Sequence, residues 1–524
     1  MKAKIRLVRF NPVTGDVRGN TERIVAAARE AAGAGVDAVV FPQSALGGAC
    51  LGDLQRRGAF VDAVDAELRR LERALPEGLP LVLGTPLRMR DGVCSAMVAY
   101  GAGGGRGRRV VCSSEFAGAG TWGVVEAGEG RLGVLLGDVA KGDIPAGACD
   151  ALVRVQSMVY LRGQERAGEA EAEKLARRFG VPVLGVNLSG AQDGVVFDGA
   201  AVGVAADGTV GARSGLFGEG AWDVEFGEGG AVSGKVEEVP GELAAVWGAL
   251  RTGIRDYAVK NRFPGALVAL SGGIDSALVA ALAVDALGAG KVMGVTLPSS
   301  ITSSETLEDA LELARRLGIP CLRIPIAPAV DAFGKMLEAG CAGVDWAAPL
   351  PGTLVEENLQ ARVRGVVVMA LSNRYGHLVL ATGNKSEVST GYATLYGDMC
   401  GGFAPIKEVP KTMVFALSRW RNGQGDGEVI PASTIERPPS AELRPGQKDS
   451  DSLPPYDVLD PLLERYMEGR EGVAELVASG VPEDVARRVA RLVGRSEYKR
   501  RQGAPGVVLE PARWRMPITN GFME

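Results

Sequence analysis

The sequence is poor in several residue types that common catalytic sites require. Its 524 residues include one histidine, His377, and only 5% aromatic residues. A single histidine excludes metal sites built from several imidazoles and argues against a Ser-His or Cys-His catalytic arrangement. His377 precedes the apolar run Leu-Val-Leu-Ala at 378–381, so we assign it a structural place at the start of a strand.

Cysteine is also sparse. The seven cysteines, at positions 50, 94, 112, 149, 321, 341 and 400, are dispersed, and no two form a Cys-x-x-Cys pair. Such a set is typical of reduced thiols rather than of a disulfide framework. The chain also lacks an apolar run near the roughly 20 residues that a membrane span needs, and its first residues do not resemble a signal segment. We therefore expect a soluble cytoplasmic protein.

Neither sign of charge is in large excess. The chain has 58 Lys and Arg against 63 Asp and Glu, a net charge of −5. This balance gives no electrostatic reason to expect nucleic acid or an anionic membrane as a partner. A hydrophobic content of 46% is enough to bury sizeable cores. The length predicts two or more domains.

The most informative segment that is present reads Ser-Gly-Gly-Ile-Asp-Ser-Ala, at 271–277. It follows an apolar run and leads into a helical pattern from 274 to 287, so it predicts a strand joined to a helix by a glycine-rich loop. Glycines let backbone N–H groups close around a phosphate, and the helix N-terminus adds positive potential. Ser271 and Ser276 add hydroxyl donors, and Asp275 offers a carboxylate to a magnesium ion on the phosphates.

No Gly-Lys-Ser/Thr follows the loop, so it is not a Walker motif. It resembles the pyrophosphate-binding loop of ATP pyrophosphatases, which cut ATP between its α- and β-phosphates. A glycine-rich turn without a ligand is the alternative.

Strand-like runs alternate with helical patterns along most of the chain, which predicts an α/β protein with a parallel, doubly wound sheet.

Further polar segments accompany the loop. Asn358 and Arg362 lie four residues apart on a predicted helix, which puts an amide and a guanidinium on one face. The segment Thr-Gly-Asn-Lys-Ser-Glu (382–387) follows a predicted strand, where doubly wound folds place ligand contacts. Lys411 and Ser440 supply a cation and a hydroxyl for phosphate or adenine. Each feature also has an ordinary explanation as a solvated helix face, a loop or a turn.

Together these segments resemble the NAD+ synthetase family over roughly residues 245–524. The resemblance implies a synthetase domain at 246–524 with a Rossmann-like sheet of the ATP pyrophosphatase type, acting with ATP and Mg2+ on deamido-NAD+ and ammonia. It also implies a homodimer through this domain, with larger assemblies in two-domain members. The matching motifs stand in family order at 271–277, 356–362, 381–387, 391–399, 438–445 and 496–502.

The resemblance also implies roles for single residues. Asp275, Glu387 and Lys411 would be catalytic, with Asp275 and Glu387 at the metal. The expected contacts to deamido-NAD+ are Asn358, Arg362, Glu387, Tyr392, Leu395 and Lys499. The expected contacts to ATP are Leu270, Ser271, Gly272, Gly273, Asp275, Ser276, Thr382, Lys411 and Ser440.

Residues 1–228 resemble the nitrilase-type glutaminase domain, an αββα sandwich, and 229–245 would form a linker. That family uses a Glu-Lys-Cys triad as base, oxyanion stabiliser and nucleophile. The corresponding positions here are Gln43, Phe116 and Gly137. We therefore predict that this half has no glutaminase activity, and that ammonia comes from solution or from a separate glutaminase protein.

Three other functions remain open at this stage. The chain would be a true glutamine-dependent NAD+ synthetase if other residues replaced the triad. It would be a different amidotransferase, forming for example GMP or asparagine, if the loop served another substrate. It would be a non-catalytic regulatory homologue if both halves were inactive, although Asp275, Glu387 and Lys499 argue against that.

Overall fold

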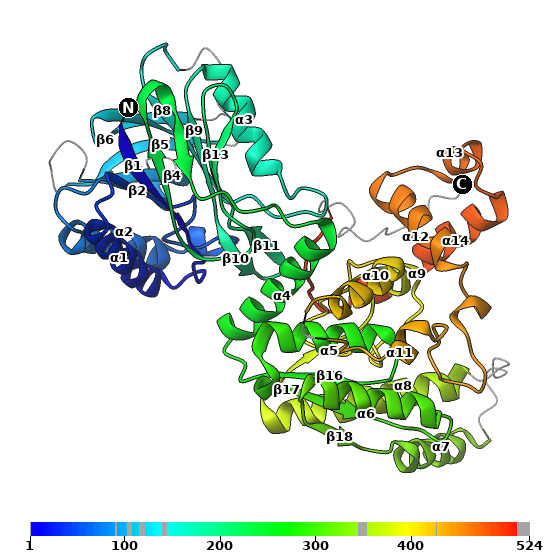
Figure 1. Cartoon of the computed structure of the whole chain (residues 1–524). Helices are drawn as coiled ribbons and strands as arrows, with labels where there is room; N and C mark the ends of the chain where they lie inside the picture. Colours follow the sequence, from blue (N-terminus) through cyan, green and yellow to red (C-terminus); the bar gives the residue numbers. More distant parts are fainter. Residues whose placement is uncertain are drawn as a thin grey trace. The chain divides into compact units, whose positions relative to one another are not determined.

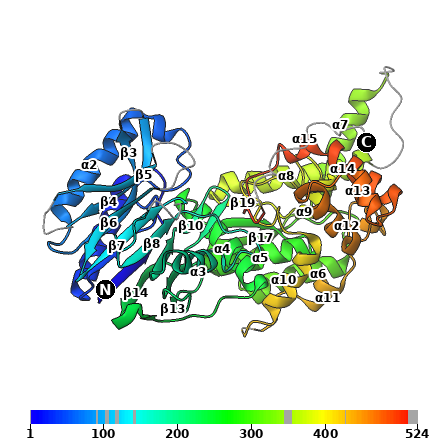
Figure 2. The same cartoon turned by 90° about the horizontal axis from the view of Figure 1, so that it is seen from above.

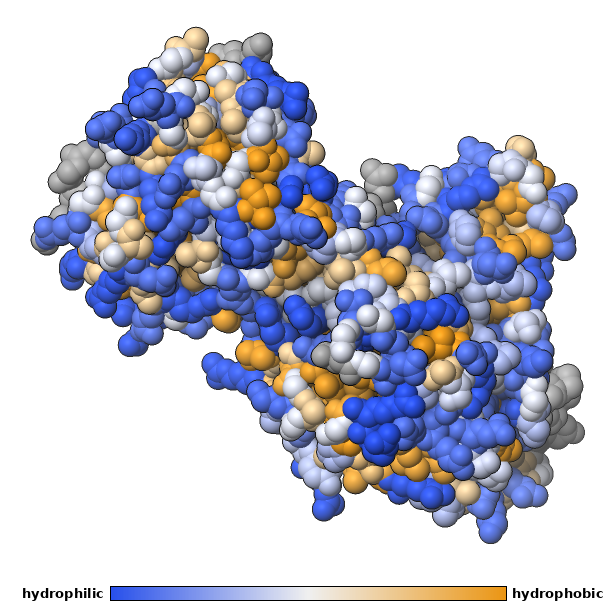
Figure 3. All heavy atoms as spheres, viewed as in Figure 1, coloured by the Kyte–Doolittle hydropathy of each residue, from blue (hydrophilic) through white to orange (hydrophobic). Residues whose placement is uncertain are grey.

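A computed structural model describes the protein at residues 2–89, 92–101, 107–114, 121–138, 144–343, 354–425 and 427–510. The chain forms two compact units, Met1–Thr252 and Gly253–Glu524, and α4 (Glu242–Lys260) runs through the boundary (Figure 1). Within the described ranges no helix is both long and apolar enough to span a membrane. Hydrophilic residues predominate on the face that Figure 3 shows, and hydrophobic ones gather there in small patches.

The first unit contains two large sheets. One has the order β15-β14-β1-β2-β3-β4-β5 and the other β13-β12-β9-β8-β7-β6, and a separate hairpin pairs β10 with β11. The short β15 lies within the range expected for a linker and pairs with β14 at the sheet edge. The strands are β1 (Ala3–Arg9), β2 (Ala38–Val40), β3 (Leu81–Met89), β4 (Gly92–Tyr100), β5 (Arg109–Ser114), β6 (Thr121–Ala127), β7 (Gly130–Leu136), β8 (Ala151–Gln156), β9 (Val183–Asn187), β10 (Ser189–Gln192), β11 (Val195–Asp198), β12 (Ala201–Val204), β13 (Val210–Arg213), β14 (Gly220–Phe226) and β15 (Val232–Gly234).

Alternation along the strands builds three apolar layers in this unit. In β1, Leu7 faces the second sheet, whereas Val8 packs with α1 (Val17–Gly33) and α2 (Gly58–Ala74) on the outer face. In β8, Val153 faces the first sheet, and Leu152 packs with α3 (Ala167–Phe179) on the other side. Successive strand residues point to opposite faces, so each sheet packs against the other sheet on one face and against helices on the other. The result is the αββα sandwich that the sequence predicted.

The second unit contains a four-stranded sheet in the order β18-β17-β16-β19. All three neighbouring pairs are parallel, which confirms the predicted parallel sheet. The strands β16, β17 and β19 are mostly buried and apolar because helices cover both faces, whereas the edge strand β18 is partly exposed and ends in the exposed Arg323. The strands are β16 (Ala266–Ala269), β17 (Val292–Thr296), β18 (Cys321–Arg323) and β19 (Leu378–Leu380).

Helices cover the two faces of this sheet, as Figure 2 shows. On one side lie α5 (Ile274–Leu287), α6 (Ser304–Leu317) and α10 (Lys411–Asn422), and on the other lie α7 (Ala327–Cys341) and α8 (Leu354–Tyr375). This doubly wound arrangement brings the carboxyl ends of β16, β17 and β19 to one edge, where such folds bind ligands. The remaining helices are α9 (Lys385–Thr390), α11 (Ala432–Glu436), α12 (Tyr456–Leu463), α13 (Val473–Ala478), α14 (Glu483–Arg495) and α15 (Glu497–Arg500).

Candidate active site

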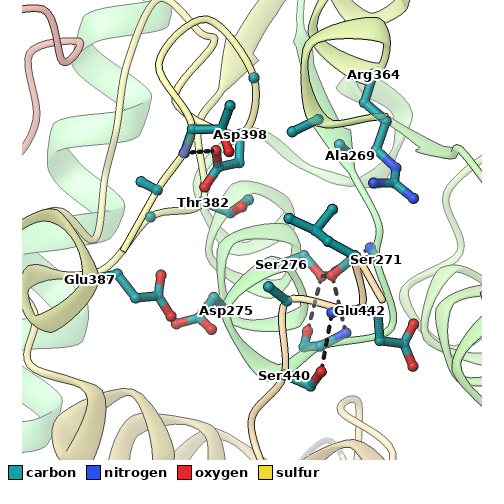
Figure 4. A pocket seen from close by; sticks show the side chains of 18 of the residues that line it. Ala269, Ser271, Asp275, Ser276, Arg364, Thr382, Glu387, Asp398, Ser440 and Glu442 are labelled. Carbon is teal, nitrogen blue, oxygen red and sulfur yellow. Dashed lines mark hydrogen bonds between the residues drawn. The ribbon is translucent and has the colours of Figure 1, made fainter. Parts of the chain in front are cut away.

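A cavity of about 550 Å³ lies at this edge of the parallel sheet in the second unit (Figure 4). Its wall is assembled from the ends of three strands and from loops that are distant in sequence. Most of the residues predicted to contact ATP or the dinucleotide line it: Leu270, Ser271, Gly272, Gly273, Asp275, Ser276, Asn358, Thr382, Glu387, Tyr392, Lys411, Ser440 and Lys499.

The glycine-rich loop needs its first glycine. Gly272 has a φ of +82°, and a Cβ atom there would lie 2.1 Å from the carbonyl oxygen of Thr306. Both the conformation and the close approach exclude a side chain. Behind the loop, the hydroxyl oxygens of Ser271 and Ser276 are 3.1 Å apart, and Ser276 donates to the carbonyl of Gly273 at 2.9 Å. The two serines therefore fix the turn that opens α5.

Lys411 connects the two carboxylates that were predicted to be catalytic. It is 2% exposed, and its Nζ donates to Oδ2 of Asp275 and, at 3.0 Å, to Oε1 of Glu387. Figure 4 shows the carboxylates of Asp275 and Glu387 directed toward each other on the cavity wall. The other carboxylate oxygen of Asp275 accepts a hydrogen bond from Nδ2 of Asn384 at 2.8 Å.

Burial and charge shift the pKa values of this cluster. Burial raises the pKa of Glu387 to about 8, because the Lys411 ammonium only partly offsets desolvation and the Asp275 carboxylate adds to it. Burial alone would lower the pKa of Lys411, but the carboxylates of Asp275 and Glu387 outweigh it, and the pKa is raised. Lys411 therefore stays protonated and holds its positive charge at the sheet edge.

The oxygen atoms of this cluster are the type of ligand that Mg2+ prefers. Within the described ranges, however, no group of three or more acidic, histidine or cysteine side chains is arranged to hold a metal ion. Asp275 and Glu387 provide two carboxylates. Since Mg2+ keeps waters and commonly shares phosphate oxygens of its substrate, these two carboxylates fit an ion that arrives with a nucleotide.

Two other residues of the wall, both predicted substrate contacts, hold protein segments. Oδ1 of Asn358, on α8, accepts a hydrogen bond from Oγ1 of Thr394 at 2.8 Å. Lys499, on α15, donates from Nζ to the carbonyls of Gly391 at 2.8 Å and Ala393 at 2.6 Å. Both side chains therefore order the loop after α9, whose residues line the cavity.

Arg362 and Leu395 are the two predicted site residues that are absent from the described cavity wall. The exposed Arg362 donates from Nε to the carbonyl of Leu395 at 3.3 Å. Asn358 therefore faces the cavity without Arg362 beside it, although the two are four residues apart on one helix. Their contacts with a ligand stay a prediction.

Several polar residues of the wall were not predicted. The half-buried Arg364 donates from Nε to the carbonyl of Leu297 at 3.1 Å, and desolvation lowers its pKa. Glu442 accepts from Oγ1 of Thr306 at 2.6 Å, and the buried Asp449 lies on the same wall. Glu442 belongs to the motif at 438–445, which the resemblance includes, whereas nothing in the local sequence pattern indicated Arg364 or Asp449.

Two of the three positions that the resemblance predicts for a triad in the first unit lie in the described part of the chain. Nε2 of Gln43 donates to Oγ of Ser95 at 3.1 Å, and an amide cannot take up a proton as a carboxylate base does. Gly137 follows β7 with a φ of +77° and carries no nucleophile. Phe116 lies outside the described residues.

The chain is similar to known proteins along its whole length. A family model described as NAD synthase matches residues 246–503. The glutamine-dependent NAD(+) synthetase of Synechocystis sp. is 36% identical over 99% of both chains. That of Xanthomonas campestris pv. campestris is 39% identical over 99% of this chain and 98% of the relative.

Solved structures agree with these matches. The glutamine-dependent NAD+ synthetase from Acinetobacter baumannii, in complex with ADP, has a TM-score of 0.75 and 32% identity, and covers 100% of this chain and 99% of that one. A glutamine-dependent NAD(+) synthetase from Cytophaga hutchinsonii has a TM-score of 0.82 at 18% identity, covering 100% and 98%, and supports the fold alone.

Proposed function

This chain belongs to the glutamine-dependent NAD+ synthetase family, and we propose that it differs from its named relatives in using ammonia that another source supplies. The protein is an NAD+ synthetase that amidates deamido-NAD+ with ATP. The proposal concerns the source of nitrogen. It depends on the resemblance to the nitrilase-type family, which assigns Gln43 and Gly137 to the positions where a glutaminase needs a carboxylate base and a thiol.

The proposed chemistry of the second unit has two steps. The nicotinate carboxylate attacks the α-phosphate of ATP, and the bond to the β-phosphate breaks, which gives an acyl-adenylate and pyrophosphate. Ammonia then attacks the acyl carbon, AMP leaves, and one proton is released. Neither step needs a protein nucleophile, so the chemistry is compatible with a chain that has one histidine.

The loop and the charged cluster supply what the first step requires. Two anions must approach each other, and fixed dipoles and cations stabilise the charge that develops. Backbone groups of Gly272 and Gly273 and the N-terminus of α5 would cradle the phosphates, with the Lys411 ammonium beside them. Asp275 and Glu387 would hold Mg2+. When bound, this ion would neutralise phosphate charge.

A homodimer through the second unit is also proposed. Large apolar side chains remain exposed on two helices of one sheet face, and burying them against a second copy would remove them from water. They are Phe333, Met336 and Leu337 on α7 and Val355, Val366 and Met369 on α8.

The decisive experiment compares nitrogen sources for the purified chain. We expect NAD+ formation with ATP, Mg2+, deamido-NAD+ and ammonium, and none above background with glutamine alone. Adding an unrelated glutaminase should restore activity with glutamine, which shows that the synthetase unit was competent in that mixture. A Gln43→Ala variant should use ammonium as well as the wild type does.

The second candidate function is a complete glutamine-dependent NAD+ synthetase. The printed names of the relatives favour it, since each is called glutamine-dependent. Efficient use of glutamine by the purified chain alone, with glutamate released in step with NAD+, would establish this alternative and refute the ammonia proposal.

A further inference from the structure

The side chain of Asn384 is completely buried, and it contacts the carboxylate of Asp275 and the backbone of Glu387. Its Nδ2 donates to Oδ1 of Asp275 at 2.8 Å, and its Oδ1 accepts from the backbone N–H of Glu387 at 3.0 Å. One amide thus joins the first turn of α5 to the first turn of α9. It does not line the described cavity, so it reaches the reaction only through its neighbours.

We propose that Asn384 is a positioning residue, which sets the placement of Asp275 relative to Glu387 for adenylate formation. The inference rests on the proposed function of the second unit. It assigns to Asn384 a role in the geometry of the reacting groups beyond that of a helix cap.

The orientation of the amide is fixed by its surroundings. Asn384 is the N-cap of α9, so its oxygen must face the N–H of Glu387. The amide nitrogen is then left facing Asp275, which as a carboxylate can only accept. A flipped amide would place oxygen against a carboxylate and nitrogen against an N–H, and would lose both bonds. The side chain therefore has one satisfied arrangement.

The same arrangement closes a ring of contacts. Lys411 binds the second oxygen of Asp275 and also Glu387, while Asn384 binds the first oxygen of Asp275 and the backbone of Glu387. Lys411 attracts both carboxylates but, through one oxygen of Asp275, leaves that carboxylate group free to rotate about its Cβ–Cγ bond. The second bond from Asn384 removes that freedom, because both oxygens of Asp275 are then held.

The competing explanation is that Asn384 only caps α9. The two explanations differ for conservative variants. Serine, aspartate and asparagine are nearly equal N-caps, so a capping role predicts that Asn384→Ser and Asn384→Asp behave like the wild type. A positioning role predicts otherwise. Serine is too short to donate to Asp275 while it caps, and aspartate replaces the donor by a second carboxylate.

The test is steady-state kinetics of pyrophosphate release with saturating ammonium, together with thermal unfolding of the full chain. We expect Asn384→Ser to lower kcat by about 10- to 100-fold, the usual effect of losing a group that orients a catalytic ligand. Its unfolding midpoint should fall by only a few degrees, because the cap is kept and the bond to Asp275 alone is lost. Asn384→Asp should be at least as impaired, because it adds charge beside Asp275.

Asn422 offers a matched control. Its Nδ2 donates to the carbonyl of Ile430 and its Oδ1 accepts from the N–H groups of Val429 and Ile430, away from the cavity. Asn422→Ser should lower the unfolding midpoint and leave kcat unchanged. Wild-type kcat in both Asn384 variants would overturn the proposal.

A failure of the proposed function can be distinguished from a failure of the positioning role of Asn384. If the wild type forms no NAD+ from any nitrogen source, ATP binding by calorimetry replaces turnover. Asn384→Ser should then weaken binding of ATP with Mg2+ by about tenfold or more. Equal affinity of the variant and the wild type would overturn the positioning role in that case.

Discussion

Asp275 and Lys411, 136 residues apart in the chain, form an ion pair that joins the first turn of α5 to the first residue of α10. Two helix N-termini thus meet at one edge of the sheet. Each carries partial positive charge, and the Lys411 ammonium adds a full one. The carboxylate of Asp275 pairs with this positive region in the absence of ligand, and Glu387 adds a hydrogen bond to Lys411.

Removing the carboxylate of Asp275 should stop the first chemical step. We expect Asp275→Ala to abolish adenylate formation, because the variant loses a proposed Mg2+ ligand and the anchor of Lys411. Pyrophosphate release is the measurement. Asp285→Ala is the control, since Asp285 joins the same two helices through Arg421 outside the described cavity wall. That control should lose stability and keep the chemistry, whereas near-normal pyrophosphate release by Asp275→Ala would contradict the assignment.

The first glycine of the loop should be intolerant of any side chain. In Gly272→Ala, the new methyl group would meet the backbone of Thr306 and strain a positive φ, so the loop must shift. We expect ATP affinity, measured by calorimetry, to fall by about tenfold or more, because the phosphate contacts depend on placement within an ångström. At Gly290 a Cβ would meet nothing within 4 Å, and Gly290→Ala should bind ATP normally. Equal affinities would show that the loop does not hold the phosphates.

The first unit contains an ion pair whose contribution to stability should depend on pH. Asp223 on β14 accepts from Arg6 on β1 at 2.7 and 2.9 Å, and lies 3.3 Å from the ammonium of Lys4. Burial tends to raise the pKa of Asp223, but the contacts with Arg6 and Lys4 outweigh it, and the pKa is lowered. A lowered pKa in the folded state stabilises the fold above the ordinary pKa of an aspartate, and this stability is lost as pH falls through the lowered value.

Asp223→Asn should therefore destabilise the first unit at pH 7 by about 1–3 kcal/mol, the usual range for hydrogen bonds to a partly buried charge. The difference from the wild type should shrink as pH falls below about 4. Hydrogen exchange of the β14 segment, measured across this range, is a suitable readout. Glu22→Gln, which breaks an exposed pair with Arg18, should change little. A pH-independent difference would rule out the charge as its cause.

The local sequence pattern was sufficient to predict the helix and strands that hold the site. The predicted bounds of α5 match the observed Ile274–Leu287, because a largely apolar segment without glycine or proline lies between Gly273 and Gly288. The strand before it and the strand β19 were predicted within two residues, since buried parallel strands are continuous apolar runs. The αββα sandwich followed from the resemblance, whereas several of its antiparallel strands, such as β4 and β6, were not predicted individually.

Contacts between distant segments were less predictable. Helical spacing placed Asn358 and Arg362 on one face, but it could not show that Thr394 and Leu395 would engage them separately. The ordering role of Lys499 depends on carbonyl groups more than 100 residues away. Such pairings arise from the folded topology, and periodicity along the chain does not encode them.

The edge position of β15 matters for any attempt to express the two units separately. A fragment ending at residue 228 would leave one side of β14 without its partner, with backbone donors and acceptors open to other chains. Such a fragment would be prone to aggregate for reasons unrelated to its chemistry. A fragment that continues beyond Gly234 keeps that edge covered, and is the sound starting point for asking what the sandwich binds.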